Sequence, residues 1–246
     1  MIRAILFDKD GTLVDFEASW RPVYTHAARF LATQWTGGPG MMGGDAPVTA
    51  RADALAERML ASTGYDAALG RSAADSTLVS GSNADIASAW ASAAGRACDA
   101  ALVETVDRLF TASATPVAAV SDLDGLLAGF VARDIVLGVA TMDSETGAFS
   151  TLDALGVRRR FAFVCGYDSG FGVKPGAGMV LAFCEATGLA PAQVAVVGDS
   201  LHDVHMGRAA GAGLVVGIDG GSGGRADLAE VADHVVADIG ALGEFL

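Results

Sequence analysis

Apolar and polar positions follow two different patterns along this 246-residue chain. From residue 116 onward, short β-prone apolar runs are followed by longer segments with helical spacing, which is typical of strands and helices in turn. The predicted strands cover residues 135–140, 161–165, 194–197, 214–218 and 234–236, and the predicted helices cover 122–132, 144–155, 176–187 and 202–210. This alternation predicts a parallel sheet with helices on both faces.

Residues 16–115 show helical spacing instead, apart from residues 64–83, which have no clear period, and no pattern there favours a strand. The first helix is expected to start near Ser19, a good capping residue, with Pro22 in its first turn. Further helices are predicted at 48–62 and over much of 84–110. The apolar run Ile2–Phe7 comes before this segment and has the pattern of a buried strand, so we expect it to rejoin the sheet.

The predicted fold class is therefore α/β, with a doubly wound parallel sheet that is interrupted by an inserted domain. The core comprises residues 1–15 and 116–246, and the insertion, residues 16–115, is predicted to be an all-helical cap domain. A hydrophobic fraction of 52% is typical of a globular protein and supplies enough apolar surface for such a core.

Composition and charge narrow the choice of partners and compartment. The formal net charge of −13 argues against nucleic acid and anionic membranes as partners. No uncharged apolar run reaches the roughly 18 residues of a membrane span, and residues 1–15 lack the features of a signal peptide. Three cysteines without Cys-x-x-Cys spacing indicate reduced thiols. We expect a cytoplasmic protein that is a monomer or a small homo-oligomer.

Two carboxylates stand at the end of the first predicted strand. Asp8 and Asp10 are two residues apart, and because such residues share a side of a strand, both are expected to face one small volume. Like charges this close raise one another's pKa unless a cation binds between them. Gly11 then permits a chain reversal that a β-carbon would resist.

Polar residues also follow the later predicted strands. Ligand sites of open α/β sheets lie beyond the carboxyl ends of the strands. There, Thr141 and Met142 precede a predicted helix and could cradle a phosphate. Lys174, one of two lysines in the chain, precedes the next helix, and Asp199 and Asp203 follow a later strand. Four acids, one hydroxyl and one lysine at a single sheet edge predict a phosphoryl site that holds Mg²⁺.

The motif residues resemble those of a known family. The motifs of this chain are, in order, Asp8-Lys9-Asp10-Gly11-Thr12-Leu13, Thr141, Lys174-Pro175 and Gly198-Asp199-x₃-Asp203. Their residues and their order are similar to the four motifs of the haloacid dehalogenase (HAD) superfamily. The stretch from Gly166 to Asp203 further resembles bacterial phosphoglycolate phosphatase-type members. The resemblance implies a Mg²⁺-dependent phosphatase that hydrolyses a small phosphorylated metabolite, a phosphoglycolate-like monoester, through an aspartyl-phosphate intermediate.

The resemblance also implies a role for each motif residue. Asp8 would be the nucleophile and Asp10 the general acid/base. Thr141, the backbone N–H of Met142 and Lys174 would hold the phosphoryl oxygens, with Lys174 also orienting Asp8. The implied metal residues are Asp8, Asp10 (through its backbone carbonyl), Asp199 and, through water, Asp203. Family members often carry Asn where this chain has Met142, so the detail of that loop departs from the pattern.

Other interpretations of these residues stay open. A phosphomutase or another HAD phosphoryl-transfer enzyme shares the core motifs, and the cap would decide between them. The intact acids and Lys174 disfavour a non-catalytic binding module. A carboxylate at Asp10 disfavours dehalogenation, and the lack of any lysine in residues 16–115 disfavours a Schiff-base phosphonatase. Arg21, the cap arginine nearest in sequence to the nucleophile, is the expected substrate contact.

Overall fold

The computed structural model describes residues 1–37, 47–73, 76–113, 115–219 and 224–246. The chain divides into two compact units. The sheet unit comprises Met1–Phe16 and Thr115–Leu246, and the inserted unit comprises Glu17–Ala114. Among the described helices, none is both long enough and apolar enough to cross a membrane.

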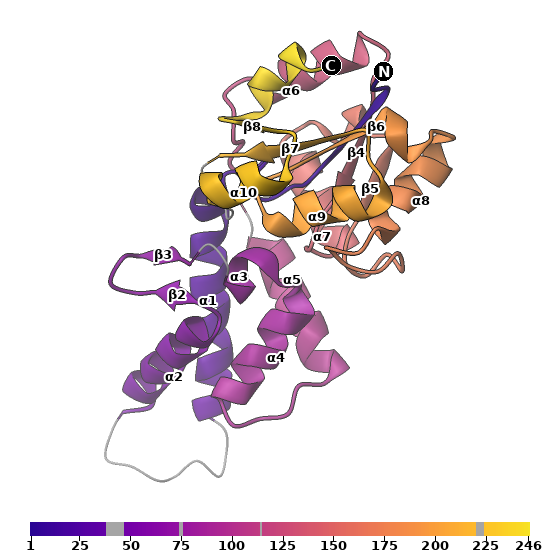
Figure 1. Ribbon diagram of the computed structural model, residues 1–246. Coiled ribbons are helices and arrows are strands. Elements are labelled where there is room, and N and C mark those ends of the chain that lie inside the picture. The colour runs from indigo at the N-terminus through magenta and orange to yellow at the C-terminus, as the bar shows by residue number, and fades with distance from the viewer. Residues whose placement is uncertain (38–46, 74–75, 114, 220–223) are drawn as a thin grey trace. The chain divides into compact units, whose positions relative to one another are not determined.

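The sheet unit is built on six parallel strands (Figure 1). Their order across the sheet is β5-β4-β1-β6-β7-β8, with the bounds Phe163–Cys165, Val136–Ala140, Ala4–Phe7, Val194–Gly198, Leu214–Ile218 and His234–Val236. After β1 the chain builds outward through β4 and β5, and then it returns to place β6 on the other side of β1. The strand order therefore reverses at β1 and β6, where open α/β sheets bind their ligands.

Helices cover both faces of this sheet. They are α6 (Leu123–Val131), α7 (Glu145–Ala154), α8 (Gly178–Thr187), α9 (Leu201–Ala210) and α10 (Arg225–Val231). Phe7 of β1 belongs to one core cluster together with Leu152 of α7. Its neighbour Leu6 belongs to another cluster, with Phe183 of α8. Because successive strand side chains point to opposite faces, both faces of β1 are buried, and the predicted doubly wound α/β class is confirmed.

The bounds of the predicted elements in the sheet unit lie within two residues of the observed ones. One α-helix was missed, as were three short 3-10 helices, Arg158–Arg160, Pro191–Gln193 and Ile239–Glu244. The missed α-helix is α10, which has seven residues and follows a glycine-rich stretch. Leu228 is its buried residue. One buried position gives no helical period, so the sequence pattern carries no signal for this helix.

The inserted unit is mainly helical, but the prediction that it is all-helical is wrong. Its helices are α1 (Phe16–Thr36), α2 (Val48–Ser62), α3 (Thr77–Ser80), α4 (Asn83–Ala93) and α5 (Ala100–Ser113). Between α2 and α3, β2 (Tyr65–Asp66) and β3 (Arg71–Ser72) form an antiparallel pair. Strands of two residues are too short to show alternation. The pair is stabilised by the Ser72 backbone N–H, which donates to the Glu17 carboxylate at 2.8 Å.

Two predicted helix boundaries in this unit are also wrong. The helix predicted over 84–110 is two helices, α4 and α5, because Gly95 adopts a φ of +67° that ends the first one. The helix predicted to start near Ser19 begins three residues earlier, so Ser19 is buried inside α1 and Pro22 stands beyond the first turn. Glu17 in the first turn favours this earlier start because an acid there interacts well with the helix dipole.

Candidate active site

β1 and β6 end side by side, and an acid follows each strand. Phe7 pairs with Val197 in the parallel register, and the backbone N–H of Asp8 donates to the Val197 carbonyl at 2.8 Å. This bond holds Asp8 beside the end of β6, which Asp199 follows. One carboxylate oxygen from each of Asp8, Asp199 and Asp203 lies within 4.8 Å of the others, and all three residues are buried. We call these three residues the strand-end acids.

Two glycines let the backbone approach these acids closely. A β-carbon at Gly11 would lie 2.4 Å from an Asp199 carboxylate oxygen, and a β-carbon at Gly198 would lie 2.3 Å from Asp203. Gly11 also has a φ of +87°, which residues with a side chain rarely adopt. Gly11 therefore makes the turn that the sequence predicts and, in addition, leaves the room that Asp199 occupies.

Asp203 is fixed by the way α9 begins. Ser200 caps the helix: its Oγ accepts the backbone N–H of Asp203 at 3.2 Å, and its own N–H donates to Asp203 Oδ2 at 3.1 Å. The Ser200 hydroxyl also lies 2.5 Å from the same Oδ2. Oδ2 of Asp203 thus accepts the Ser200 hydrogen bonds that cap the amino end of α9. Ser200 is absent from the predicted site residues, although Ser-x-x-Asp is the sequence signature of a capping box.

Lys174 joins the loops that follow β1 and β6. Its Nζ lies 2.5 Å from Asp8 Oδ1 and 2.5 Å from Asp203 Oδ1, and its side chain is 2% exposed. Burial lowers the pKa of Lys174, but attraction to Asp203 and Asp8 outweighs burial, so the pKa rises above its usual value. Lys174 is therefore a fixed positive charge directly beside Asp8.

Even with Lys174 in place, this cluster carries excess negative charge. Burial raises the pKa of Asp8 well above its usual value, Lys174 opposes that effect, and Asp203 and Asp199 add to it. Three buried carboxylates face one ammonium group, which leaves the ionised form of the cluster in need of a cation. Clustered carboxylate oxygens are the ligands that Mg²⁺ prefers. The residues fit the divalent cation that the sequence predicts.

Asp10 lies apart from the strand-end acids, and its carboxylate is not part of that cluster of described residues. It pairs instead with Lys9, whose Nζ is 2.8 Å from Asp10 Oδ2 and 3.0 Å from Oδ1. The Asp10 side chain remains 15% exposed, so a ligand can reach it. Both roles predicted for Asp10, proton transfer by its side chain and a metal contact by its backbone carbonyl, stay predictions.

Thr141 and Met142 lie in the loop after β4, the strand next to β1. Thr141 is buried, its N–H donates to the Cys165 carbonyl at 3.0 Å, and its Oγ1 accepts the backbone N–H of Asp143 at 3.1 Å. A hydroxyl that accepts one hydrogen bond can still donate another. Met142 is half-buried. The predicted phosphate-binding role of both residues stays a prediction.

Two charged residues of these loops were missed by the sequence analysis. Lys9 is fully buried, and its Nζ lies 3.1 Å from Oδ2 of Asp143, which is also buried. Continued through residue 10, the strand period would place Lys9 on the side opposite Asp8 and Asp10, but β1 ends at Phe7 and Lys9 instead contacts Asp10. Only the packing of β4 beside β1 brings Asp143 to this lysine.

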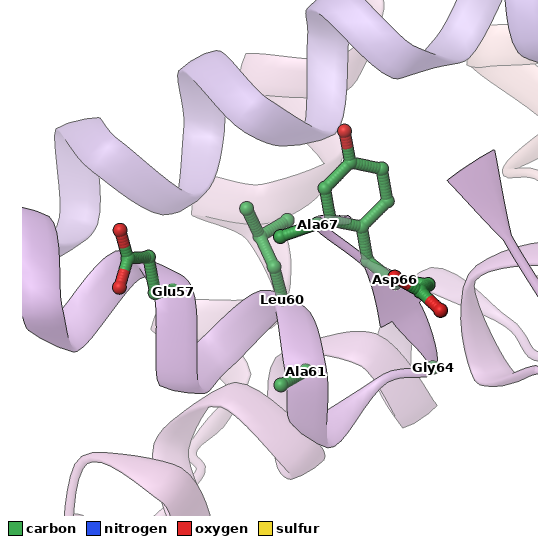
Figure 2. Close-up of a pocket in the computed structure, with 7 residues that line it drawn as sticks. Glu57, Leu60, Ala61, Gly64, Asp66 and Ala67 are labelled. Atoms are coloured by element: carbon green, nitrogen blue, oxygen red, sulfur yellow. The ribbon is translucent and has the colours of Figure 1, made fainter. Parts of the chain in front are cut away.

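The inserted unit has a hollow of its own, of about 540 Å³, lined by α2, β2 and the residues next to β2 (Figure 2). Its lining residues are Glu57, Leu60, Ala61, Gly64, Tyr65, Asp66 and Ala67. Two of these seven are acids and none is basic, which disfavours a phosphate ligand. Arg21, the predicted substrate contact, is exposed and donates to the Gly70 carbonyl at 3.5 Å within the same unit.

Solved structures share this fold along nearly the whole chain. A predicted phosphoglycolate phosphatase from Haemophilus somnus 129PT matches with a TM-score of 0.65 at 20% identity, covering 99% of this chain and 97% of that one. A candidate β-phosphoglucomutase from Thermotoga maritima matches with a TM-score of 0.62 at 22% identity, covering 100% of both chains. The protein is thus an α/β protein of the doubly wound class, with its acids at the strand-order reversal.

Sequence comparison identifies the family. The model of the haloacid dehalogenase-like hydrolase family matches residues 2–211, and the chain belongs to this family of hydrolases. A phosphoglycolate phosphatase from Chromobacterium violaceum is 38% identical over 87 residues, which are 35% of this chain and 39% of that relative. The chain therefore matches about two fifths of the relative's length. The family predicted from the motif residues is confirmed.

Proposed function

We propose that this protein is a Mg²⁺-dependent phosphatase that hydrolyses a small phosphate monoester through an aspartyl-phosphate on Asp8. The position of Asp8 supports this function, because its buried carboxylate contacts Lys174 and lies close to the other strand-end acids. Acids alone would repel a phosphate. Together with a divalent cation and an ammonium group, they form a site that favours phosphoryl transfer.

In this reaction Asp8 is the nucleophile, and Asp10 first donates and then accepts a proton. In the first step an Asp8 carboxylate oxygen bonds to phosphorus, the bond from phosphorus to the ester oxygen breaks, and that oxygen takes a proton from the Asp10 carboxyl. In the second step a water oxygen bonds to phosphorus, its proton goes to the Asp10 carboxylate, and the bond to Asp8 breaks. The products are an alcohol and phosphate, with both acids restored.

Lys174 holds the phosphoryl group against Asp8. Its Nζ is already 2.5 Å from Asp8, so a transferring group meets a fixed positive charge that needs no rearrangement. We assign the Thr141 hydroxyl and the backbone N–H of Met142 as the further donors. The Thr141 N–H is used by the Cys165 carbonyl, and its hydroxyl hydrogen therefore makes the bond to phosphate.

The residues that would hold Mg²⁺ are Asp8, Asp199, Asp203 and the backbone carbonyl of Asp10. The cation would supply charge neutralisation for the phosphoryl oxygens and for the acids around them. Because Ser200 holds Oδ2 of Asp203 and Lys174 holds Oδ1, Asp203 suits an indirect contact through water better than a direct one.

The substrate is proposed to be a small phosphoglycolate-like monoester, on the strength of the likeness to the Chromobacterium violaceum phosphatase. The inserted unit is assigned the role of a cap domain that selects it. We infer that the enzyme acts in the cytoplasm on free metabolites, as a monomer or small homo-oligomer. A net charge of −13 opposes nucleic acid and anionic membranes as partners.

A phosphomutase is the second candidate, because the fold is also that of the candidate β-phosphoglucomutase from Thermotoga maritima. In that reaction Asp8 would receive the phosphoryl group in the same way. The group would then pass to a second hydroxyl of a sugar phosphate instead of to water, so the two functions differ in the acceptor of the second step.

A substrate panel tests the proposal. Purified protein is given 2-phosphoglycolate, sugar phosphates and other small monoesters, and both free phosphate and isomerised product are measured. We expect phosphate release that needs Mg²⁺ and that stops with EDTA or in Asp199→Asn. Asp153→Asn, which neutralises an acid that is 58% exposed on α7, is the matched control and should stay active. Isomerisation without phosphate release would favour the mutase, and metal-independent turnover would contradict the metal's role.

A further inference from the structure

Lys9 is a fully buried lysine between two carboxylates. Its Nζ lies 2.8 Å and 3.0 Å from the two oxygens of Asp10. On another side the same Nζ lies 3.1 Å from Oδ2 of Asp143. The residue is 0% exposed, so its four-carbon stem is packed by protein and the position of the ammonium group is fixed.

The charge of Lys9 is retained in spite of this burial. Burial lowers the pKa of Lys9, but attraction to Asp10 and Asp143 outweighs burial, so the pKa is raised. A buried ion pair is weak evidence of a stabilising role, because apolar side chains of the same volume often serve the fold equally well. A buried lysine in contact with both oxygens of a site carboxylate therefore calls for an explanation beyond stability.

Asp143 is held as firmly as Lys9. The backbone N–H of Ser144 donates to Asp143 Oδ1 at 2.7 Å, and the Asp143 N–H donates to Thr141 Oγ1 at 3.1 Å. Gly147 in the first turn of α7 leaves the room this carboxylate needs, since a β-carbon there would lie 2.6 Å from both of its oxygens. The Lys9–Asp143 pair thus ties the loop after β1 to the loop after β4.

We propose that Lys9, anchored by Asp143, is a positioning residue that fixes the Asp10 carboxyl in the orientation needed to protonate the leaving group. This inference rests on the proposed function, in which Asp10 carries that proton. Contact with both Asp10 oxygens restricts rotation of the carboxyl group about its Cβ–Cγ bond, while the 15% exposure of the side chain keeps it within reach of a ligand. Preorganised geometry of this kind is a large part of what an enzyme contributes to proton transfer.

The inference predicts a dependence on the leaving group. An alkyl phosphate expels an alkoxide, which needs a proton as the bond to phosphorus breaks. 4-Nitrophenyl phosphate expels a stabilised phenolate, which does not. A misplaced Asp10 carboxyl should therefore slow the first step, transfer of the phosphoryl group to Asp8, selectively for the first kind of substrate. The second step, with water, is common to both kinds of substrate, so the comparison is made on kcat/KM, which reports the step that expels the leaving group. A merely structural lysine would slow both kinds alike, because loss of folded enzyme does not distinguish leaving groups.

The test compares Lys9→Met with the wild-type protein on two substrates. They are 4-nitrophenyl phosphate and the alkyl phosphate with the highest wild-type kcat/KM. For Lys9→Met we expect kcat/KM on the alkyl phosphate to fall on the order of 10²-fold, the lower end of what general acid catalysis supplies, with a fall of no more than about threefold on the aryl phosphate. Equal losses on both substrates would overturn the inference. A wild-type protein inactive on both would refute the proposed function instead.

Two further variants distinguish a positioning role of Lys9 from a role in folding alone. Lys9→Met/Asp143→Asn removes both charges of the anchor and keeps the group that accepts the Ser144 N–H, so it should fold and retain the selective loss. Arg208→Met is the matched control, since it breaks an ion pair with Asp233 at 2.8 Å near the amino end of β7, away from the strand-end acids. Arg208→Met should leave the ratio of kcat/KM on the alkyl phosphate to kcat/KM on the aryl phosphate unchanged. Alkyl-phosphate activity restored in the double variant, or failure of both Lys9 variants to fold, would show that the pair is structural and would overturn the inference.

Discussion

Replacing Gly11 by alanine tests whether Asp199 binds the metal. The new β-carbon would lie 2.4 Å from Asp199 Oδ2, and ordinary van der Waals contact begins at 3.4 Å, so the carboxylate must move by about 1 Å. Metal–ligand distances tolerate about 0.2 Å. The displaced oxygen therefore cannot stay in the position it has now.

The size of the effect follows from two separate contributions. A side chain at a φ of +87° costs about 1–2 kcal/mol of folding free energy through backbone strain. Displacing a metal ligand through its neighbour typically costs about 10–100-fold in metal affinity, or about 1.4–2.8 kcal/mol. Gly170 separates the two contributions, because it has a φ of +85° and a β-carbon added there would meet no atom of the described residues within 4 Å.

The assay is a Mg²⁺ titration of phosphatase activity, together with thermal unfolding, for Gly11→Ala and Gly170→Ala. Both variants should unfold at a lower temperature than the wild type, Gly11→Ala by at least as much as Gly170→Ala. Only Gly11→Ala should need at least about tenfold more Mg²⁺ for half-maximal activity. The same Mg²⁺ requirement in both variants would refute the assignment of Asp199 as a ligand held in place by the space at Gly11.

The remaining predictions concern the phosphate donors and the cysteines. Lys174→Met should lower kcat on the order of 10²-fold or more, because it removes a charge aimed at the transferring group. Met142→Asn should change kcat by no more than about tenfold, since a backbone N–H makes that contact; an effect as large as that of Lys174→Met would contradict this assignment. In the folded protein Ellman's reagent should react with exposed Cys98 and not with Cys165, where burial raises the thiol pKa to about 12, or with buried Cys184. Rapid labelling of all three before unfolding would show that the core is open.

The sequence predicts the sheet and most of the acids because both depend on local patterns. Apolar runs such as Val194–Gly198 are buried on both faces and bounded by glycine or polar residues, and acids directly after them reach one edge in any parallel sheet. The β2–β3 pair escapes prediction because each strand has two residues. The break at Gly95 is missed because a glycine inside a helical pattern is often tolerated.

The buried lysine illustrates what local patterns cannot show. Nothing near Lys9 in sequence indicates that its ammonium group is buried, because the second carboxylate that holds it comes from Asp143 on the loop after β4. The room for that carboxylate comes in turn from Gly147. Such contacts between distant segments appear only when the strands are placed side by side.

The most direct test of the account is to look for the phosphate on Asp8 itself. The protein is mixed with Mg²⁺ and its best substrate, quenched with acid within the first turnover, and digested for mass spectrometry. We expect a phosphorylated peptide whose phosphate maps to Asp8, and neither this peptide nor turnover in Asp8→Asn. Steady phosphate release by an Asp8→Asn enzyme, with no phosphate found on Asp8 in the wild type, would contradict the central claim.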